Sequence, residues 1–223
     1  MSRTYPVDNR NKVKRVPGRG HYDKETVYEI LDCGEIAHVS FVMDGQPFII
    51  PTLYGRKDNA VYIHGSAASR MLKTLVKGVP CSMAVTLVDG LVLARSAFHH
   101  SMNYRSVVLY GNAALVSDEH KEEGLQIISE HIIPGRWEES RKPEPKELKG
   151  TTVLRMDIDQ ASAKIRTGGP VDEERDYDLP VWAGTIPITR KAGEPIPDPL
   201  AKYDQPVPES VANYLEHYRR MNE

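Results

Sequence analysis

Residues 36–54 read IAHVSFVMDGQPFIIPTLY, and this stretch decides the fold. The runs Ile36–Met43 and Pro47–Tyr54 are rich in β-branched and aromatic residues, and Asp44-Gly45 stands between them. An Asp-Gly pair between two such runs is among the strongest short-range signals for a β-hairpin, because both residues tolerate the positive φ of a tight turn. The sequence therefore predicts a hairpin here.

The same pattern continues along the chain. Ser82–Val88, Asp89-Gly90 and Leu91–Phe98 predict a second hairpin. Further strands are expected over residues 60–64, 104–116, 152–158 and 161–166, and helices over residues 23–31, 66–77, 118–132 and 209–220. Hairpins dominate and strand–helix–strand alternation is missing, so we expect a mainly β fold, a small closed or partly open barrel with a few peripheral helices.

Composition bounds the organisation and the partners. With 223 residues, of which 40% are hydrophobic, the chain can bury one substantial core. We expect a basic arm over residues 1–20, the barrel over 21–187, and a tail over 188–223 whose short helix packs on the barrel or on a partner subunit. A net charge of -2 gives no footprint for nucleic acid, and no apolar run is long enough for a membrane span. Cys33 and Cys81 lie far apart, as in reduced proteins, so we expect a cytoplasmic protein.

The stretch from Val61 to Lys73 is the first candidate site. A strand ends at His64, Gly65 allows close approach, and a helix is expected from Ser66. The hydroxyls of Ser66 and Ser69, the Arg70 guanidinium and the free amides of a first helical turn would together cradle a phosphate. An ordinary capped helix with a solvated arginine is the alternative.

Two further stretches carry polar or aromatic groups. His99 and His100 precede the strand that Arg105 and Ser106 open, but neighbouring strand residues point to opposite faces, so no metal site is predicted. Trp182 lies between a proline and a glycine, where it either packs or stacks on a planar ligand.

In their order and spacing these stretches resemble the FMN-binding split-barrel family of pyridoxamine 5'-phosphate oxidase, and in particular its branch of flavin-nucleotide-binding and nitroimidazole-resistance proteins. The resemblance runs from about Gly20 to Pro187. It implies a split β-barrel with Greek-key-like topology, FMN as the cofactor, and a homodimer with flavin at the subunit interface.

The resemblance also assigns site residues. It places Ile50, Pro51 and Thr52 beside the isoalloxazine ring, and it gives His64 a redox or substrate-orienting role. The remaining assigned positions are the phosphate-binding turn with Gly65, Ser66, Ser69 and Arg70, the flavin-reaching pair Arg105 and Ser106, and Trp182 from the partner subunit.

The chain departs from the oxidases in two places. Met71 stands where they have a lysine, and residues 186–190 lack their Arg-Leu-His substrate signature, so pyridoxamine phosphate is not expected as the substrate. We expect an FMN-dependent oxidoreductase that passes electrons from a reduced nicotinamide or deazaflavin to a small acceptor, although turnover itself is left open. The alternatives are a non-catalytic flavin-binding or storage protein, and a haem-binding relative with His64, His99 or His100 as axial ligand.

Overall fold

The hairpin at residues 36–54 forms as expected. In the computed structural model, which describes residues 2–220, β2 (Ile36–Met43) pairs antiparallel with β3 (Gln46–Leu53). Asp44 and Gly45 have φ values of 51° and 73°, the positive values that a two-residue hairpin turn requires.

The second Asp-Gly pair does not form a turn, which corrects the sequence-based expectation. β6 runs unbroken from Pro80 to Leu93, and its pairing with β7 (Ser101–Leu115) shifts register between Val88 and Gly90. A β-carbon on Gly90 would lie 3.0 Å from the Ile186 carbonyl oxygen, so this glycine permits the close approach of another strand. The pair therefore forms a β-bulge, and the chain reverses only beyond Leu93.

Ten strands and six α-helices make up the described chain. The other strands are β1 (Gly20–His21), β4 (Gly55–Lys57), β5 (Ala60–Ser66), β8 (Thr151–Asp157), β9 (Gln160–Arg166) and β10 (Gly184–Pro187). The helices are α1 (Lys24–Cys33), α2 (Arg70–Leu75), α3 (Lys121–Ile132), α4 (Arg136–Glu139), α5 (Pro145–Gly150) and α6 (Glu209–Arg220).

The strands form one antiparallel sheet that bends into an open barrel. Its main path is β3-β2-β6-β7-β8-β5-β4, with β9 added on β7, β1 on β9 and β10 on β6. The two ends of this path, β3 and β4, are separated in sequence by Tyr54 alone. The chain itself thus joins the two edges where hydrogen bonds do not, and the predicted mainly β split barrel with peripheral helices is confirmed.

The helices α1, α2, α3 and α5 pack against strands of the barrel, and two helices differ from expectation. Asp23 caps α1 as predicted, since its side chain accepts a hydrogen bond from the Thr26 amide. The helix predicted over residues 66–77 is only α2, because Ser69 and not Ser66 is its N-cap. The helix predicted from Asp118 begins as a 3₁₀ turn and becomes α3 at Lys121.

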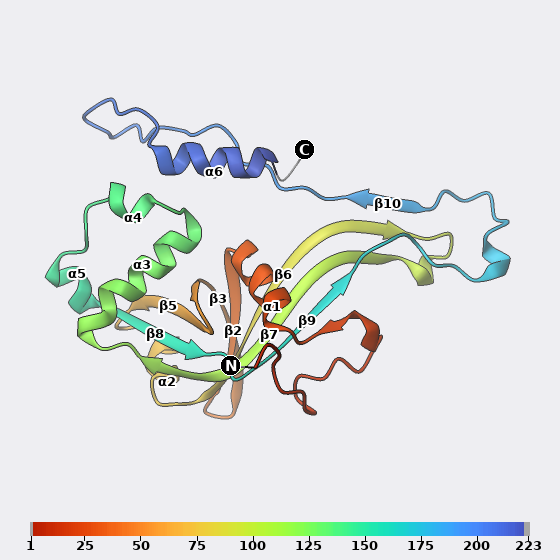
Figure 1. Cartoon of the computed structure of the whole chain (residues 1–223), viewed down its shortest axis with the longest axis horizontal. Helices are drawn as coiled ribbons and strands as arrows, with labels where there is room; N and C mark the ends of the chain where they lie inside the picture. The colour runs from red at the N-terminus through yellow and green to blue at the C-terminus, as the bar shows by residue number, and fades with distance from the viewer. Residues whose placement is uncertain (1, 221–223) are drawn as a thin grey trace.

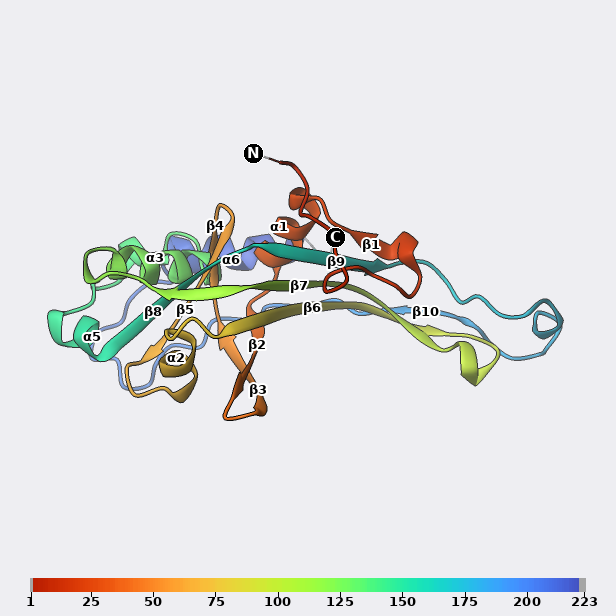
Figure 2. The ribbon, with the colours of Figure 1, turned by 90° about the horizontal axis from the view of Figure 1, so that it is seen from below.

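The two terminal segments lie differently with respect to the barrel. The N-terminal arm folds back onto it, where Tyr5 and Asn11 are buried and the Tyr5 hydroxyl donates to Asn59. β6, β7 and β10 leave the barrel together as a long arm, and the chain after β10 runs back over the molecule to α6 (Figures 1 and 2). No helix within residues 2–220 is long and apolar enough to cross a membrane.

Candidate functional site

α2 lies against the β2–β3 hairpin, and this contact creates the main candidate site. The Arg70 guanidinium stacks over the Phe48 ring, with its central carbon 4.5 Å from the ring centroid. The Thr74 hydroxyl lies 3.3 Å from the Met43 sulfur. Within residues 2–220 no carboxylate pairs with Arg70, so its charge is held on an aromatic surface and is not neutralised.

The turn that precedes α2 uses both of its serine hydroxyls. Ser66 Oγ accepts a hydrogen bond from the Ala68 amide at 3.1 Å, and Ser69 Oγ accepts one from the Leu72 amide at 3.5 Å. Gly65 lies against Leu72, whose Cδ1 would be 3.2 Å from an added β-carbon. His64, Gly65 and Ser66 are the last residues of β5, so this strand runs two residues beyond its predicted end, and Ser69 and Arg70 follow after a short turn.

His64 stands on β5, next to this turn, directly opposite Val153 on β8. Its neighbours Val61 and Ile63 point into the barrel core, so His64 lies on the other face of the strand. Its Nδ1 atom is buried and has no hydrogen-bond partner among the described residues. Burial lowers the pKa of His64, so the imidazole is held in its neutral form.

The three predicted residues of β3 do not share one face. Ile50 is partly buried against the core, and the Thr52 hydroxyl donates to the Leu53 carbonyl at 3.2 Å. Pro51 is exposed on the opposite face, paired in register with His38. A ligand beside β3 would therefore meet the side chain of Pro51, or those of Ile50 and Thr52, but not all three.

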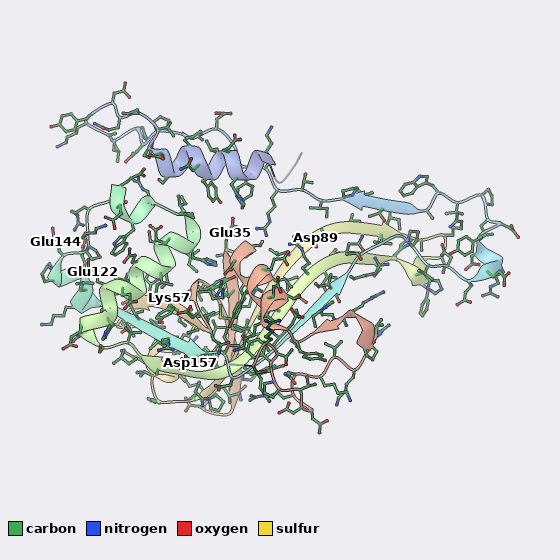
Figure 3. The ribbon with its side chains drawn as sticks, in the orientation of Figure 1. Glu35, Lys57, Asp89, Glu122, Glu144 and Asp157 are labelled. Carbon is green, nitrogen blue, oxygen red and sulfur yellow. The ribbon has the colours of Figure 1, made fainter. Side chains whose placement is uncertain are left out.

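Arg105 and Ser106 are likewise on opposite faces of β7. Arg105 forms a two-point ion pair with Asp89, and the Ser106 hydroxyl donates to the Lys164 carbonyl at 3.3 Å. Figure 3 shows Asp89 where the β6–β7 arm leaves the barrel, away from α2. The structure does not bring this pair to Arg70 within one chain.

Trp182 is also remote from Arg70. It is 66% exposed, and its ring lies against Gly184 at the start of β10. β10 and α2 lie in opposite halves of the molecule along its long axis (Figure 1). Contact between Trp182 and the Arg70 site would therefore require a second copy of the chain.

His99 and His100, the other two histidines considered in the sequence analysis, contact residues outside the Arg70 site. His100 Nδ1 accepts a hydrogen bond from the Ala94 amide, and His99 lies 3.8 Å from Glu173. No group of three metal-ligating side chains occurs within the described residues. Cys81 is buried, which raises the pKa of its thiol to about 11, and Cys33 is free and exposed.

Two residues near these elements, Phe48 and Glu35, were not predicted from the sequence to have a role. The Phe48 ring lies under Arg70, but the sequence analysis assigned Phe48 only to a strand. Its alternation with Ile50, which places both side chains on one face of β3, is the pattern that could have indicated this. Glu35 precedes β2 and accepts hydrogen bonds from Tyr214 and Tyr218 of α6. No local pattern predicts this second contact, because it joins residues far apart in the chain.

Comparison with known proteins gives one matching family model and several similar structures. The model of the family described as pyridoxamine 5'-phosphate oxidase matches residues 23–165. No curated protein sequence matches the chain.

Two solved structures align with nearly the whole chain. The flavocytochrome Anf3 from Azotobacter vinelandii is 43% identical with a TM-score of 0.87, over 92% of this chain and 96% of that one. The FAD and haem binding protein from Mycobacterium smegmatis is 36% identical with a TM-score of 0.84, over 87% and 96%. A putative 5-nitroimidazole antibiotic resistance protein from Bacteroides thetaiotaomicron shares the fold at 19% identity and a TM-score of 0.53, over 66% and 86%.

Proposed function

Because this chain belongs to the pyridoxamine 5'-phosphate oxidase family, we propose that it is a redox protein that binds a flavin nucleotide and a haem. The haem, which the sequence left as an alternative to flavin, is here proposed in addition to it. The names of the Azotobacter and Mycobacterium proteins support both groups, since one is a flavocytochrome and the other binds FAD and haem.

The unneutralised Arg70 is the observation that carries the flavin proposal. Arg70 is exposed, stacks on Phe48 and has no carboxylate partner within residues 2–220, so its guanidinium is open to an anion, and a phosphate accepts its hydrogen bonds well. Arg70 follows directly on the turn that leaves His64 and β5, so a phosphate bound there would place the rest of a flavin near this strand. The sequence predicts FMN, and the name of the Mycobacterium relative suggests FAD.

We assign His64 to contact with the bound cofactor. Of His64, His99 and His100, it is the one whose ring nitrogen is buried without a partner within residues 2–220. A neutral imidazole can hydrogen-bond to a flavin ring or ligate a haem iron. Its donor chemistry therefore fits either group.

The bound groups would supply the electron chemistry, and the protein would supply binding, orientation and electrostatics. A reduced nicotinamide or deazaflavin as donor and a small molecule as acceptor remain part of the proposal. The other possibility is a flavin-binding protein without turnover.

We also propose a homodimer in which each subunit contributes to both sites. Ile49 is 64% exposed and Val42 55%, and both lie on the outer face of the β2–β3 hairpin. Apolar side chains grouped on an open face commonly mark an interface. If this face is buried against a second copy, the exposed Trp182 of one subunit could contact the Arg70 site of the other.

The test is the visible spectrum of the purified protein, desalted after addition of FMN, FAD and haemin, compared with that of two variants. Arg70→Ala should weaken flavin binding about 10- to 100-fold through loss of a charge-assisted hydrogen bond. Lys77→Ala, just beyond α2, removes the same charge and should bind flavin like the wild type. His64→Ala should alter the flavin or the Soret bands; unchanged bands would contradict its assignment.

A further inference from the structure

We propose that residues 188–220 form the outer wall of the haem site and that Glu35 holds this wall in place. The inference rests on the proposed function. It concerns the part of the chain after β10, which the matched family model does not include.

The extent of each alignment points to this segment. The match to the Azotobacter flavocytochrome leaves 8% of the chain uncovered and the match to the Mycobacterium protein 13%, in each case fewer residues than the 36 of segment 188–223. Both alignments must therefore enter this segment. The nitroimidazole-resistance-like structure, which shows the common fold, leaves a third of the chain uncovered. Part of the C-terminal segment is thus shared with the flavocytochrome and with the FAD and haem binding protein.

α6 is attached mainly through polar contacts. The Tyr218 hydroxyl donates to Glu35 Oε1 at 2.5 Å and the Tyr214 hydroxyl at 3.2 Å, while Arg190 pairs with Oε2 at 3.1 Å. At the other end of α6, Ser210 donates to Glu139 of α4 from its amide and its hydroxyl. Figure 3 shows Glu35 on the side of the barrel that faces α6.

The chain between β10 and α6 is not held by a core of its own. Ile196 is 92% exposed and Leu200 85%, so apolar burial contributes little to the position of this segment. On α6, Val211 and Leu215 are only half-buried and lie on the same side as the two tyrosines. This helix therefore presents apolar and aromatic side chains that the described chain covers incompletely.

The barrel side next to Glu35 is also apolar and open. Ile36 follows Glu35 directly and pairs in register with Leu53, and both side chains are exposed. Haem has two large apolar faces and an edge of carboxylates, so it needs apolar walls of this kind together with polar groups at the edge. Tyr214, Tyr218 and Arg190 are the polar groups that α6 and the chain before it bring to this corner.

The wall is tested in the full-length protein loaded with both cofactors. Glu35→Ala and the double variant Tyr214→Phe/Tyr218→Phe remove the contact from either side. Glu29→Ala removes an equally charged, exposed residue from α1 and serves as the matched control. Haem loss is followed as transfer to an excess of apomyoglobin, and the flavin retained by each protein is measured after the same incubation.

We call Glu35→Ala and Tyr214→Phe/Tyr218→Phe the clasp variants. We expect both to lose haem about tenfold faster than the wild type while keeping their flavin, since each lacks hydrogen bonds to a charged group. Glu29→Ala should match the wild type. Unchanged haem loss in both clasp variants would overturn the inference and leave the proposed function intact. Equal loss of flavin, or a reduced far-ultraviolet circular dichroism signal, would also overturn it, because the contact would then support the whole fold. A wild-type protein without haem would overturn the proposed function itself.

Discussion

Asp89 and Arg105 form a two-point ion pair across β6 and β7, with Nη2–Oδ1 at 2.8 Å and Nε–Oδ2 at 3.1 Å. Asp89 lies at the register shift of β6, so the pair ties the bulged strand to its neighbour. The Asp89 carboxylate raises the pKa of Arg105. The ion pair therefore fixes β6 to β7 at the place where these two strands leave the barrel.

Asp89→Asn should lower the free energy of unfolding by about 1 kcal/mol, because both side chains are about two-thirds buried and the geometry is bidentate. Asp157→Asn breaks the more exposed pair with Arg155 and should change stability by less than about 0.5 kcal/mol. Urea unfolding of the two variants makes the comparison. Equal losses in both would contradict a special role for the Asp89 pair.

Gly55 marks a close contact between β4 and α3. A β-carbon there would lie 2.6 Å from the Ile127 carbonyl oxygen, and backbone cannot move aside as a side chain can. Gly55→Ala should therefore destabilise the protein by about 2 kcal/mol or more. Gly150→Ala, where no atom lies within 4 Å of an added β-carbon, is the matched control. The midpoint of thermal unfolding is measured for both variants. Equal midpoints would show that α3 is not held against β4.

His131 predicts the pH dependence of stability. Burial lowers its pKa, and its Nε2 lies 2.7 Å from the Gly34 carbonyl oxygen, close to Asp32, Glu35 and Arg56. The folded state resists protonation, so the unfolded state binds more protons as the pH falls below the ordinary histidine pKa near 6.5. The stabilising contribution of neutral His131 is present above that pH and is lost below it.

His131→Gln should therefore reduce the loss of stability between pH 7 and pH 5, measured by urea unfolding at each pH. His64, whose pKa is lowered in the same direction, is retained in both proteins and cancels in the comparison. An identical slope in wild type and variant would mean that His131 is readily protonated in the folded state.

The proposed dimer predicts the effect of a charge on the β2–β3 face. Ile49→Lys should convert a dimer into a monomer, because a lysine cannot be buried there without a partner. Ile196→Lys, in the exposed chain before α6, should leave the mass unchanged. Light scattering coupled to size exclusion gives the mass of each protein. A dimeric Ile49→Lys protein would place the interface elsewhere, and a monomeric wild type would remove the proposal.

The two Asp-Gly pairs show what the sequence could and could not predict. Asp44-Gly45 forms its turn because the flanking strands have no competing partner at that point. Asp89-Gly90 becomes a bulge because β10, about a hundred residues later, pairs with Gly90 through Pro187 and extends the sheet. Local propensity was overruled by a pairing that no local pattern reveals.

The candidate site divides in the same way. The sequence could predict that a strand with His64 is followed at once by a helix with Arg70, because these residues are close in sequence, although the predicted strand end and helix start both came too early. The Phe48 platform, the unpartnered Nδ1 of His64 and the contact between Glu35 and α6 depend on packing between distant segments. The pleat also separates Ile50 from Pro51 and Arg105 from Ser106, whereas the resemblance grouped each set at one ligand.

Extraction and quantification of the cofactors from purified protein test the central proposal most directly. Acid-released flavin, identified as FMN or FAD by its mass, and haem, determined as its pyridine complex, are both compared with the amount of chain. The account predicts one flavin and one haem per chain after loading. Flavin without haem would reduce the protein to a flavoprotein, and the absence of both after saturation would contradict the account.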